Sequence, residues 1–185
     1  MPMKKFIISV LGCDRPGIIA AVSQVLYDQG YNIEEVSQTI LQNQFSCFFI
    51  VTGPKSSSPA KLMGELQDRT AAFDLVFNVR ELGVETVYQR CACEPFVITT
   101  HGPDRKGLVA GITSVFAAYG VNVLQLKAVF RGGDEPVGNT MIYEVDIPVE
   151  ADQKELRKSL KKKAAELGQE ISIQHKNIFE AMNRI

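Results

Sequence analysis

The sequence predicts an α+β fold in which two similar domains follow one another, each with a four-stranded antiparallel sheet and two helices on one face. Two observations indicate this fold. A segment of the chain recurs after about 90 residues, and within each copy the hydrophobic periodicity changes in the same order. A repeat of this length is too long for one layer of a solenoid, so each copy is expected to have its own core.

The repeat is clearest where residues 6–33 align with residues 96–123 without a gap. The identical pairs include Gly12/Gly102, Asp14/Asp104, Arg15/Arg105, Gly17/Gly107, Ala20/Ala110, Gly30/Gly120 and Asn32/Asn122. The chain is therefore a duplicated module, and a binding site in one copy is expected to have a counterpart in the other.

The first copy begins with a β-rich run at residues 6–11 that ends in glycine. Apolar residues then recur at helical spacing from Ile18 to Leu26. Pro16 suits the first helical position, and Gly30 suits a left-handed end of the helix. The sequence thus predicts a strand followed by a helix.

The remaining elements of the first copy are a hairpin of strands at 33–41 and 45–52 with a turn at 42–44, an amphipathic helix with Leu62, Leu66 and Phe73, and a strand at 75–82. The second copy repeats this order at 96–100, 107–119, 123–131, 140–148, 152–167 and 171–175, with a turn-rich insertion at 132–138. The order βαββαβ with right-handed crossovers predicts the ferredoxin-like arrangement. We expect the first domain at 1–83, a linker at 84–94, and the second domain with a C-terminal tail at 95–185.

Several strands are apolar on both sides. Residues 47–51 are all apolar, and Ile7 and Leu11 lie opposite Phe6, Ile8 and Val10, whereas a half-solvated sheet should alternate with polar residues. The helix-free face or the sheet edges are therefore expected to be covered by the sister domain or by a second chain. This favours a homo-oligomer, most simply a dimer.

Composition and missing motifs exclude several classes of function. The chain is 45% hydrophobic and 22% charged, which suits globular domains, and its net charge of −1 gives no general attraction to nucleic acid. The lysine-rich stretch 154–163 is explained as the solvated face of a helix.

No apolar run is long enough to cross a bilayer and no signal peptide is visible, so we expect a cytoplasmic protein. No P-loop, nucleophile elbow or dinucleotide fingerprint supports an enzyme, and the basic aromatic signature of RNA-recognition modules is absent.

The loop between the first strand and the first helix of each copy carries a resemblance. The segments Gly12-x-Asp14-Arg15-Pro16-Gly17-Ile18 and Gly102-Pro103-Asp104-Arg105-Lys106-Gly107-Leu108, each followed by Gly-x-Asn, resemble the ACT domain. The resemblance implies βαββαβ regulatory modules that bind amino acids or other small ligands at interfaces between domains. A chain with two such domains resembles the tandem-ACT family of the glycine cleavage system transcriptional repressor. Lys106 replaces Pro16 in the second copy, so the two loops need not be equal.

The chemistry of this loop suits a zwitterion. Backbone N–H groups at a helix start lack partners and can receive a carboxylate, an Asp can pair with an ammonium group, and an Asn can supply an amide. Alternatively, Asp14 and Asp104 cap their helices, and Asn32 and Asn122 adopt left-handed conformations. The residues expected to bind the ligand are Gly12, Cys13, Asp14, Pro16, Gly17, Ile18 and Asn32 in the first copy, and Gly102, Asp104, Gly107, Leu108 and Asn122 in the second.

Other polar residues receive a structural interpretation. Arg15 and Arg105 are expected to be solvated, and His101 and His175 to be structural. Cys91 and Cys93 form a Cys-x-Cys pair, but the chain offers no second pair for zinc, so no metal and no cofactor are expected. Cys47 fits a buried strand, and a helix N-terminus could activate Cys13.

Two classes of function follow. The first is a non-catalytic, allosteric sensor that binds an amino acid and signals by changed packing to a protein partner such as a transcription factor, without touching nucleic acid itself. In this case Gly17→Val or Gly107→Val should abolish binding and leave the fold intact. The second is an adaptor module whose loops stay empty.

Overall fold

The computed structural model describes residues 3–83, 92–130 and 138–178, which fall into two compact units, Met1–Tyr88 and Gln89–Ile185. The first unit contains β1 (Lys4–Cys13), α1 (Ile18–Asp28), β2 (Asn32–Leu41), β3 (Gln44–Gly53), α2 (Pro59–Arg69), the 3-10 turn η1 (Ala71–Phe73) and β4 (Val76–Leu82). The second contains β5 (Cys93–Gly102), α3 (Leu108–Ala118), β6 (Asn122–Phe130), β7 (Asn139–Pro148), α4 (Gln153–Glu166) and β8 (Glu170–His175).

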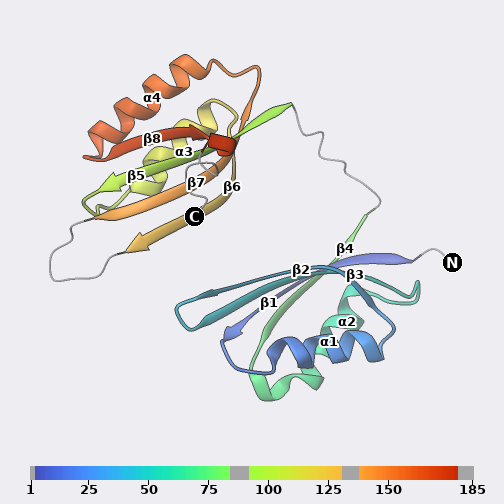
Figure 1. The fold of residues 1–185 in the computed structure, drawn as a ribbon. Coiled ribbons are helices and arrows are strands. Elements are labelled where there is room, and N and C mark those ends of the chain that lie inside the picture. The colour runs from blue at the N-terminus through green and yellow to red at the C-terminus, as the bar shows by residue number, and fades with distance from the viewer. Residues whose placement is uncertain (1–2, 84–91, 131–137, 179–185) are drawn as a thin grey trace. The chain divides into compact units, whose positions relative to one another are not determined.

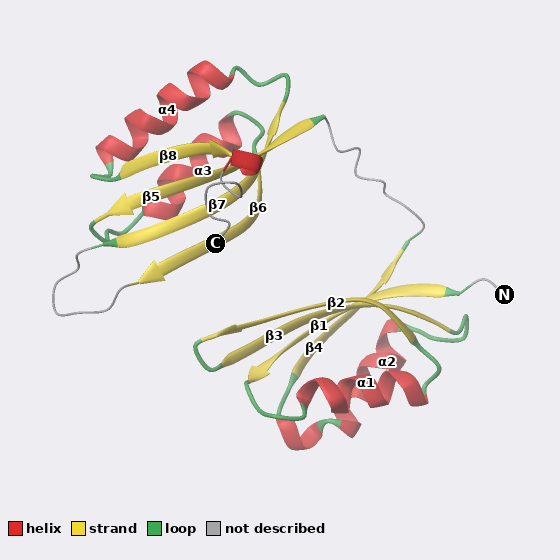
Figure 2. Ribbon diagram, viewed as in Figure 1, coloured by secondary structure: helices red, strands yellow, loops and turns green. Residues whose placement is uncertain are grey.

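Each unit holds one antiparallel sheet, with the strands in the order β2-β3-β1-β4 in the first copy and β6-β7-β5-β8 in the second (Figure 1). Both helices of each copy lie on one face of its sheet (Figure 2). This is the ferredoxin-like arrangement, and the predicted fold class is confirmed.

The core of each copy lies between the sheet and its helices. In β1, Phe6, Ile8 and Val10 are fully buried, and the residues between them face the other side of the sheet. They pack with Ile18 and Leu66 from the two helices into one apolar cluster. The second copy has its own cluster, so each unit has the separate core that the length of the repeat predicts.

Glycine sets the start and the end of α1. The helix begins at Ile18 because Gly17 before it has a φ of 98°, a left-handed conformation that an L side chain rarely adopts. The expectation that Pro16 occupies the first helical position is therefore wrong. Gly30 has a φ of 76°, which confirms the left-handed residue expected beyond the C-terminal end.

Two further local expectations are wrong. Asn32 and Asn122 begin β2 and β6, and neither is among the non-glycine residues with positive φ in the described part of the chain. Phe73 lies outside α2, because that helix ends where the Thr70 hydroxyl donates a hydrogen bond of 2.7 Å to the carbonyl of Leu66. Phe73 follows in η1 and still packs against the core.

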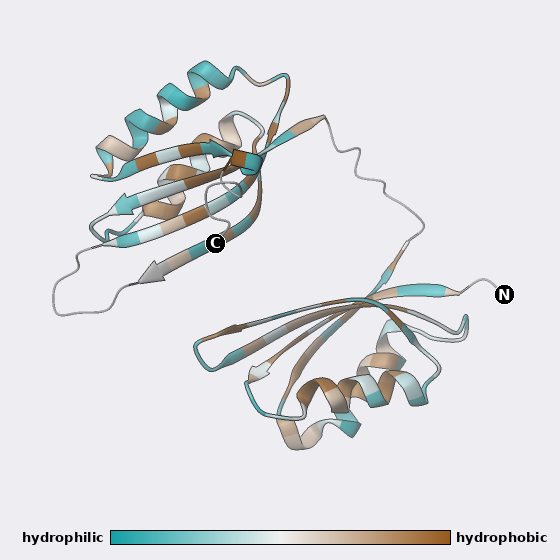
Figure 3. Cartoon of the chain, in the orientation of Figure 1, coloured by the Kyte–Doolittle hydropathy of each residue, from teal (hydrophilic) through white to brown (hydrophobic). Residues whose placement is uncertain are grey.

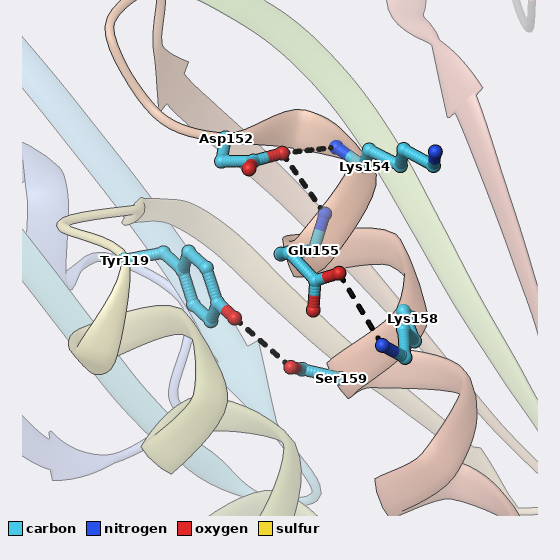
Figure 4. A network of polar contacts seen from close by, with 6 residues as sticks. All are labelled: Tyr119, Asp152, Lys154, Glu155, Lys158 and Ser159. Atoms are coloured by element: carbon cyan, nitrogen blue, oxygen red, sulfur yellow. Dashed lines mark hydrogen bonds and ion pairs between the residues drawn. The ribbon is translucent and has the colours of Figure 1, made fainter.

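The helix α4 has the solvated basic face that the sequence predicts. Figure 3 shows it as largely hydrophilic, and its buried residues are Leu156, Leu160 and Ala164. Its first turn is capped by Asp152, whose carboxylate accepts hydrogen bonds of 3.0 Å from the backbone N–H groups of Lys154 and Glu155 (Figure 4). Figure 4 also shows the hydroxyls of Tyr119 and Ser159 hydrogen-bonded at 2.9 Å, which joins α3 to α4.

The helix-free face of the first sheet exposes apolar side chains among polar ones. Phe48 is 50% exposed, and Leu11 and Val76 on β1 and β4 are also exposed, but Ser9 and Asn78 lie in the same row as Phe48. The apolar character expected of this face is therefore present only in part. That the sister domain or a second chain covers it stays a prediction.

Several expectations fall partly or wholly outside the described residues. They concern most of the linker 84–94, Cys91, the insertion 132–138 and most of the C-terminal tail. The predicted domain boundaries consequently stay a prediction, although β5 already begins at Cys93.

Candidate functional site: the β1–α1 loop

The loop after β1 is attached to the β2–β3 hairpin. Cys13 pairs with Gln44 at the end of the sheet, and the next backbone N–H, that of Asp14, donates a 2.8 Å hydrogen bond to the carbonyl of Asn43. The amide of Gln44 also lies 3.8 Å from the sulfur of Cys13. The hairpin tip therefore forms one wall of the space in front of α1.

Within the described ranges, the N-terminus of α1 has no side-chain cap. No described side chain accepts from its first N–H groups, and the first backbone hydrogen bond runs from the N–H of Ala21 to the carbonyl of Gly17, at 2.9 Å. The same holds for α3, which begins after Gly107. The alternative in which Asp14 and Asp104 cap these helices is therefore wrong. The uncapped N–H groups and the positive end of the helix dipole remain available for an anion.

A cleft of about 540 Å³ opens beside this helix start. It is lined by Asp14, Arg15, Pro16, Gly17, Ile18, Ile19, Ala20, Gln38 and Phe45. Four residues expected from the sequence are thus brought together, namely Asp14, Pro16, Gly17 and Ile18. The side chain of Ile18 belongs to the core and is 1% exposed, so it can offer a ligand only its backbone N–H.

Three lining residues outside α1 were not among those that the sequence suggested. They are Arg15, which we expected to be merely solvated, Gln38 from β2, and Phe45 from β3, whose side chain belongs to the core and is 2% exposed. Gln38 and Phe45 come from the hairpin, and only the strand register places them beside the loop. The identity of Arg15 and Arg105 in the repeat was the one available signal.

Gly12 and Cys13 do not line the cleft. A Cβ on Gly12 would lie 2.6 Å from a terminal methyl group of Leu75, so a larger residue here would require that side chain to move. Cys13 is exposed at the end of β1.

Asn32 lies at the opposite end of the sheet from the cleft. It pairs with Thr52, which in turn pairs with Lys5, whereas the loop follows Gly12. Seven residues of strand separate these two positions along β1, roughly 23 Å. One small ligand cannot contact both ends, and the same separation holds for Asn122 in the second copy.

The second copy builds its loop on different neighbours. Asn139 pairs with Gly102 as Phe45 pairs with Gly12, and Gln169 lies against Gly102 as Leu75 lies against Gly12. Two apolar residues of the first copy are thus replaced by two amides.

Both amides donate hydrogen bonds to the second loop. The amide nitrogen of Asn139 donates to the carboxylate of Asp104 at 3.1 Å, and that of Gln169 donates to the carbonyl of Pro103 at 2.8 Å. The side-chain oxygens of both amides are buried, and neither has a hydrogen-bond partner among the described residues. In this arrangement part of the Asp104 carboxylate is already engaged, unlike that of Asp14.

The remaining predicted residues of the second loop repeat the first. Gly107 has a φ of 87°, and the side chain of Leu108 is 3% exposed within the core. A Cβ on Gly102 would lie 2.7 Å from the carbonyl oxygen of Gly168. Gly102 and Gly12 are therefore packing glycines, whereas Gly107 and Gly17 shape the helix start.

The histidines have protein partners. The ring of His101 is hydrogen-bonded to the hydroxyl of Thr140 at 3.0 Å, and the ring of His175 meets Phe96 edge to face, with centroids 5.3 Å apart. Cys47 is fully buried as predicted, and burial raises its pKa to about 11. Among the described residues no cluster of His, Cys, Asp and Glu could hold a metal ion. Nor does this part of the chain contain a helix that could span a membrane.

The fold and the paired loops define a class of protein, a tandem ferredoxin-like protein with two related β1–α1 loops. The ACT domain family matches residues 4–80 and 94–174, and the chain belongs to this family. The resemblance seen in the loop segments is thereby confirmed. ACT domains are regulatory, amino-acid-binding modules that commonly form oligomers.

Single-domain relatives match half of the chain. A UPF0237 protein of Methanococcus maripaludis is 39% identical over 93 residues, which are 50% of this chain and 99% of that protein. A UPF0237 protein of Methanopyrus kandleri is 36% identical over 88 residues, 47% of this chain and 88% of that protein. Each relative therefore has the size of one copy of the repeat.

Two solved structures resemble nearly the whole chain. One is a protein of unknown function from Galdieria sulphuraria, with a TM-score of 0.76, 20% identity, and coverage of 94% of this chain and 99% of that chain. The other is provisionally named a glycine cleavage system transcriptional repressor, with a TM-score of 0.69, 16% identity, and coverage of 94% and 98%. At these identities the likeness shows the fold alone.

Proposed function

We propose that this chain is a non-catalytic regulatory protein that binds an amino acid in the cleft of the first copy. The observation that carries the proposal is the cleft of about 540 Å³ in front of an uncapped helix N-terminus. Its size lies within the usual range of small-ligand sites. Membership of a family of regulatory, amino-acid-binding modules supports the same assignment.

The groups in the cleft match the two charges of an amino acid. The backbone N–H groups of α1 and the guanidinium of Arg15 receive the carboxylate, and the carboxylate of Asp14 receives the ammonium group. The exposed side chain of Gln38 then faces the side chain of the ligand. We assign selectivity between amino acids to Gln38, because Phe45 is only 2% exposed.

Signalling would follow from differential binding. A ligand shifts an equilibrium between two packing arrangements only if it binds one of them better. We propose that the partner is a transcriptional regulator and that the regulated process is amino-acid or glycine metabolism. The provisional name of one structural neighbour supports this choice of partner and pathway.

The assembled state is proposed to be a dimer. Val36, Ile40 and Leu41 on the edge strand β2 are 53%, 48% and 76% exposed, an unusual amount of apolar surface for a sheet edge. The same exposed edge would serve the alternative function, an adaptor that binds a protein partner while its loops stay empty. The response to small molecules distinguishes the two functions.

The test is a thermal-shift screen of the full chain with each of the twenty amino acids, followed by calorimetric titration of any that raise the melting temperature. A ligand at 100 times its Kd should stabilise the folded protein by about 2.7 kcal/mol. Arg15→Gln is expected to weaken binding about tenfold, because it removes a charged hydrogen bond. Lys61→Gln, an exposed lysine outside the cleft, is the matched control. Binding that Arg15→Gln leaves unchanged would rule out the cleft, and no response to any amino acid would favour the adaptor.

The glycine substitutions considered first are a poorer test. Gly17 and Gly107 have φ values of 98° and 87°, so valine at either position strains the backbone at a helix start. Loss of binding in such variants would not separate the site from the fold. Arg105→Gln is the better variant for the second loop, because Arg105 is exposed.

A further inference from the structure

The helix-free face of the first sheet has a hollow of about 300 Å³, separate from the loop cleft. Its lining residues are Ile7, Ser9, Phe48, Asn78 and Arg80. They come from the three neighbouring strands β3, β1 and β4. This site belongs to the sheet and does not depend on the function proposed for the loop.

The strand register explains why a hollow forms there. Ser9 on the central strand pairs with Phe48 on one side and with Asn78 on the other, and Ile7 pairs with Arg80 in the next row. The short side chain of Ser9 is thus surrounded by larger ones that stand up from the sheet. Ser9 forms the floor, and Phe48 and Arg80 lie at diagonally opposite corners.

The hollow combines an apolar side with a cation that is not neutralised. Phe48 is 50% exposed, so half of its side-chain surface is open to a ligand. Arg80 makes no hydrogen bond or ion pair within the described part of the chain, while the lysines of the neighbouring strand are paired, Lys5 with Glu34 and Lys4 with Glu81. The hydroxyl of Ser9 and the amide of Asn78 add uncharged donors. None of the described residues that line the hollow carries a carboxylate.

The second copy keeps uncharged donors at these positions but lacks the aromatic ring and the arginine. In the strand register, Thr99 occupies the position of Ser9, and Ile142 that of Phe48. On the other side, Ser172 occupies the position of Asn78, and Gln174 that of Arg80. Val97, the counterpart of Ile7, is only 3% exposed. At the positions that line the hollow, the second sheet thus has neither the aromatic ring nor the arginine, so this combination of residues belongs to the first copy.

We propose that this hollow binds a small carboxylic acid with an aromatic body. The carboxylate pairs with Arg80 and accepts from Asn78 and Ser9, and the aromatic ring packs on Phe48 and Ile7. Because no carboxylate faces the hollow, the ammonium group of an amino acid would find no partner there. The ligand is therefore an acid without an amino group, which separates this site chemically from the cleft at Asp14.

The test uses 3-phenylpropionate as the probe and NMR spectra of the ¹⁵N-labelled full chain as the readout. Two analogues serve as chemical controls: 3-phenylpropionamide lacks the charge, and phenylalanine adds an ammonium group. We expect 3-phenylpropionate to shift the backbone signals of Ser9, Phe48 and Arg80, and both analogues to bind this face about tenfold more weakly or worse. Equal binding of the uncharged amide would overturn the proposal.

Two variants place residues of the second sheet at the corresponding positions of the first sheet. Arg80→Gln is expected to weaken 3-phenylpropionate about tenfold, and Phe48→Ile to weaken it several-fold, as expected for loss of an aromatic contact. Lys5→Gln, which removes a paired cation from the same face, is expected to leave the affinity within about twofold. Unchanged affinity in Arg80→Gln, or shifts that map to the loop cleft, would show that the assignment is wrong. So would signals of this face that move with protein concentration alone, because the face would then be an interface between copies.

Discussion

Raising the pH above 9 is expected to destabilise the first copy through the thiol of Cys47. This side chain is fully buried in β3, and burial raises its pKa from 9.0 to about 11. The folded state therefore holds the thiol proton more tightly than the unfolded state does. The contribution to stability is complete below pH 9 and is lost as the pH rises to 11. Two pKa units correspond to at most about 2.7 kcal/mol of unfolding free energy.

The assay is urea unfolding of the full chain between pH 8 and 10.5, followed through NMR signals of the first copy. Over this range the thiol should remove about 2 kcal/mol from the unfolding free energy. Cys47→Ala is expected to lower stability at pH 8 but to flatten the alkaline slope by that amount. Cys13→Ala, which removes an exposed thiol, should leave the slope as it is. An alkaline slope that is identical in the wild type and Cys47→Ala would refute the reasoning.

The second copy should also lose stability at high pH, but about one pH unit higher, because burial raises the pKa of Tyr143 from 10.0 to about 12. In the same assay, Tyr143→Phe is expected to reduce the loss of stability of the second copy above pH 10. Asp152→Ala should cost about 1 kcal/mol in urea unfolding, because α4 loses its N-cap, and Asp152→Ser should restore most of it. Gly107→Ala should lower the free energy of unfolding by about 1–2 kcal/mol, because alanine rarely adopts the left-handed φ of this position. Gly64→Ala, inside α2, should raise the free energy of unfolding by about 0.5–1 kcal/mol. Equal effects of the two substitutions would contradict the conformational argument. Gln169→Leu should leave the free energy of unfolding unchanged or raise it. The substitution removes a hydrogen bond, but it also removes a buried oxygen that has no partner among the described residues. A decrease of the unfolding free energy by more than about 1 kcal/mol would show that this oxygen does not destabilise the folded state.

The fold could be predicted from the sequence because its signals are local and occur twice. Strand and helix periods alternate in each copy, and glycines mark the helix ends, so the order of elements follows without tertiary information. The errors were also local. Pro16 suited a helix start, but the left-handed Gly17 moves that start to Ile18. Phe73 continued a helical pattern that the hydroxyl of Thr70 interrupts at the end of α2.

The candidate site could be predicted only where it lies within one segment. The loop residues Asp14 and Gly17 are adjacent in sequence, and the structure places both at the cleft. Gln38 and Phe45 reach the cleft only through the register of the hairpin, which no local pattern specifies. The identity of Asn32 and Asn122 in the repeat suggests that they belong with the loops, but identity in a repeat does not indicate how far a residue lies from the cleft. Asn32 lies at the far end of β2.

Identity between two copies of a loop also does not make the two sites equal. The loops share their glycines, aspartates and arginines, but the residues below them differ: Phe45 and Leu75 in the first copy, Asn139 and Gln169 in the second. A buried oxygen without a partner costs about 1–3 kcal/mol, so the amide oxygens of Asn139 and Gln169 are expected to destabilise the arrangement of the second loop. Its aspartate is also partly engaged by Asn139. The first copy, with a cleft at its loop and a hollow on its sheet, is therefore the copy in which small-molecule binding should be sought first.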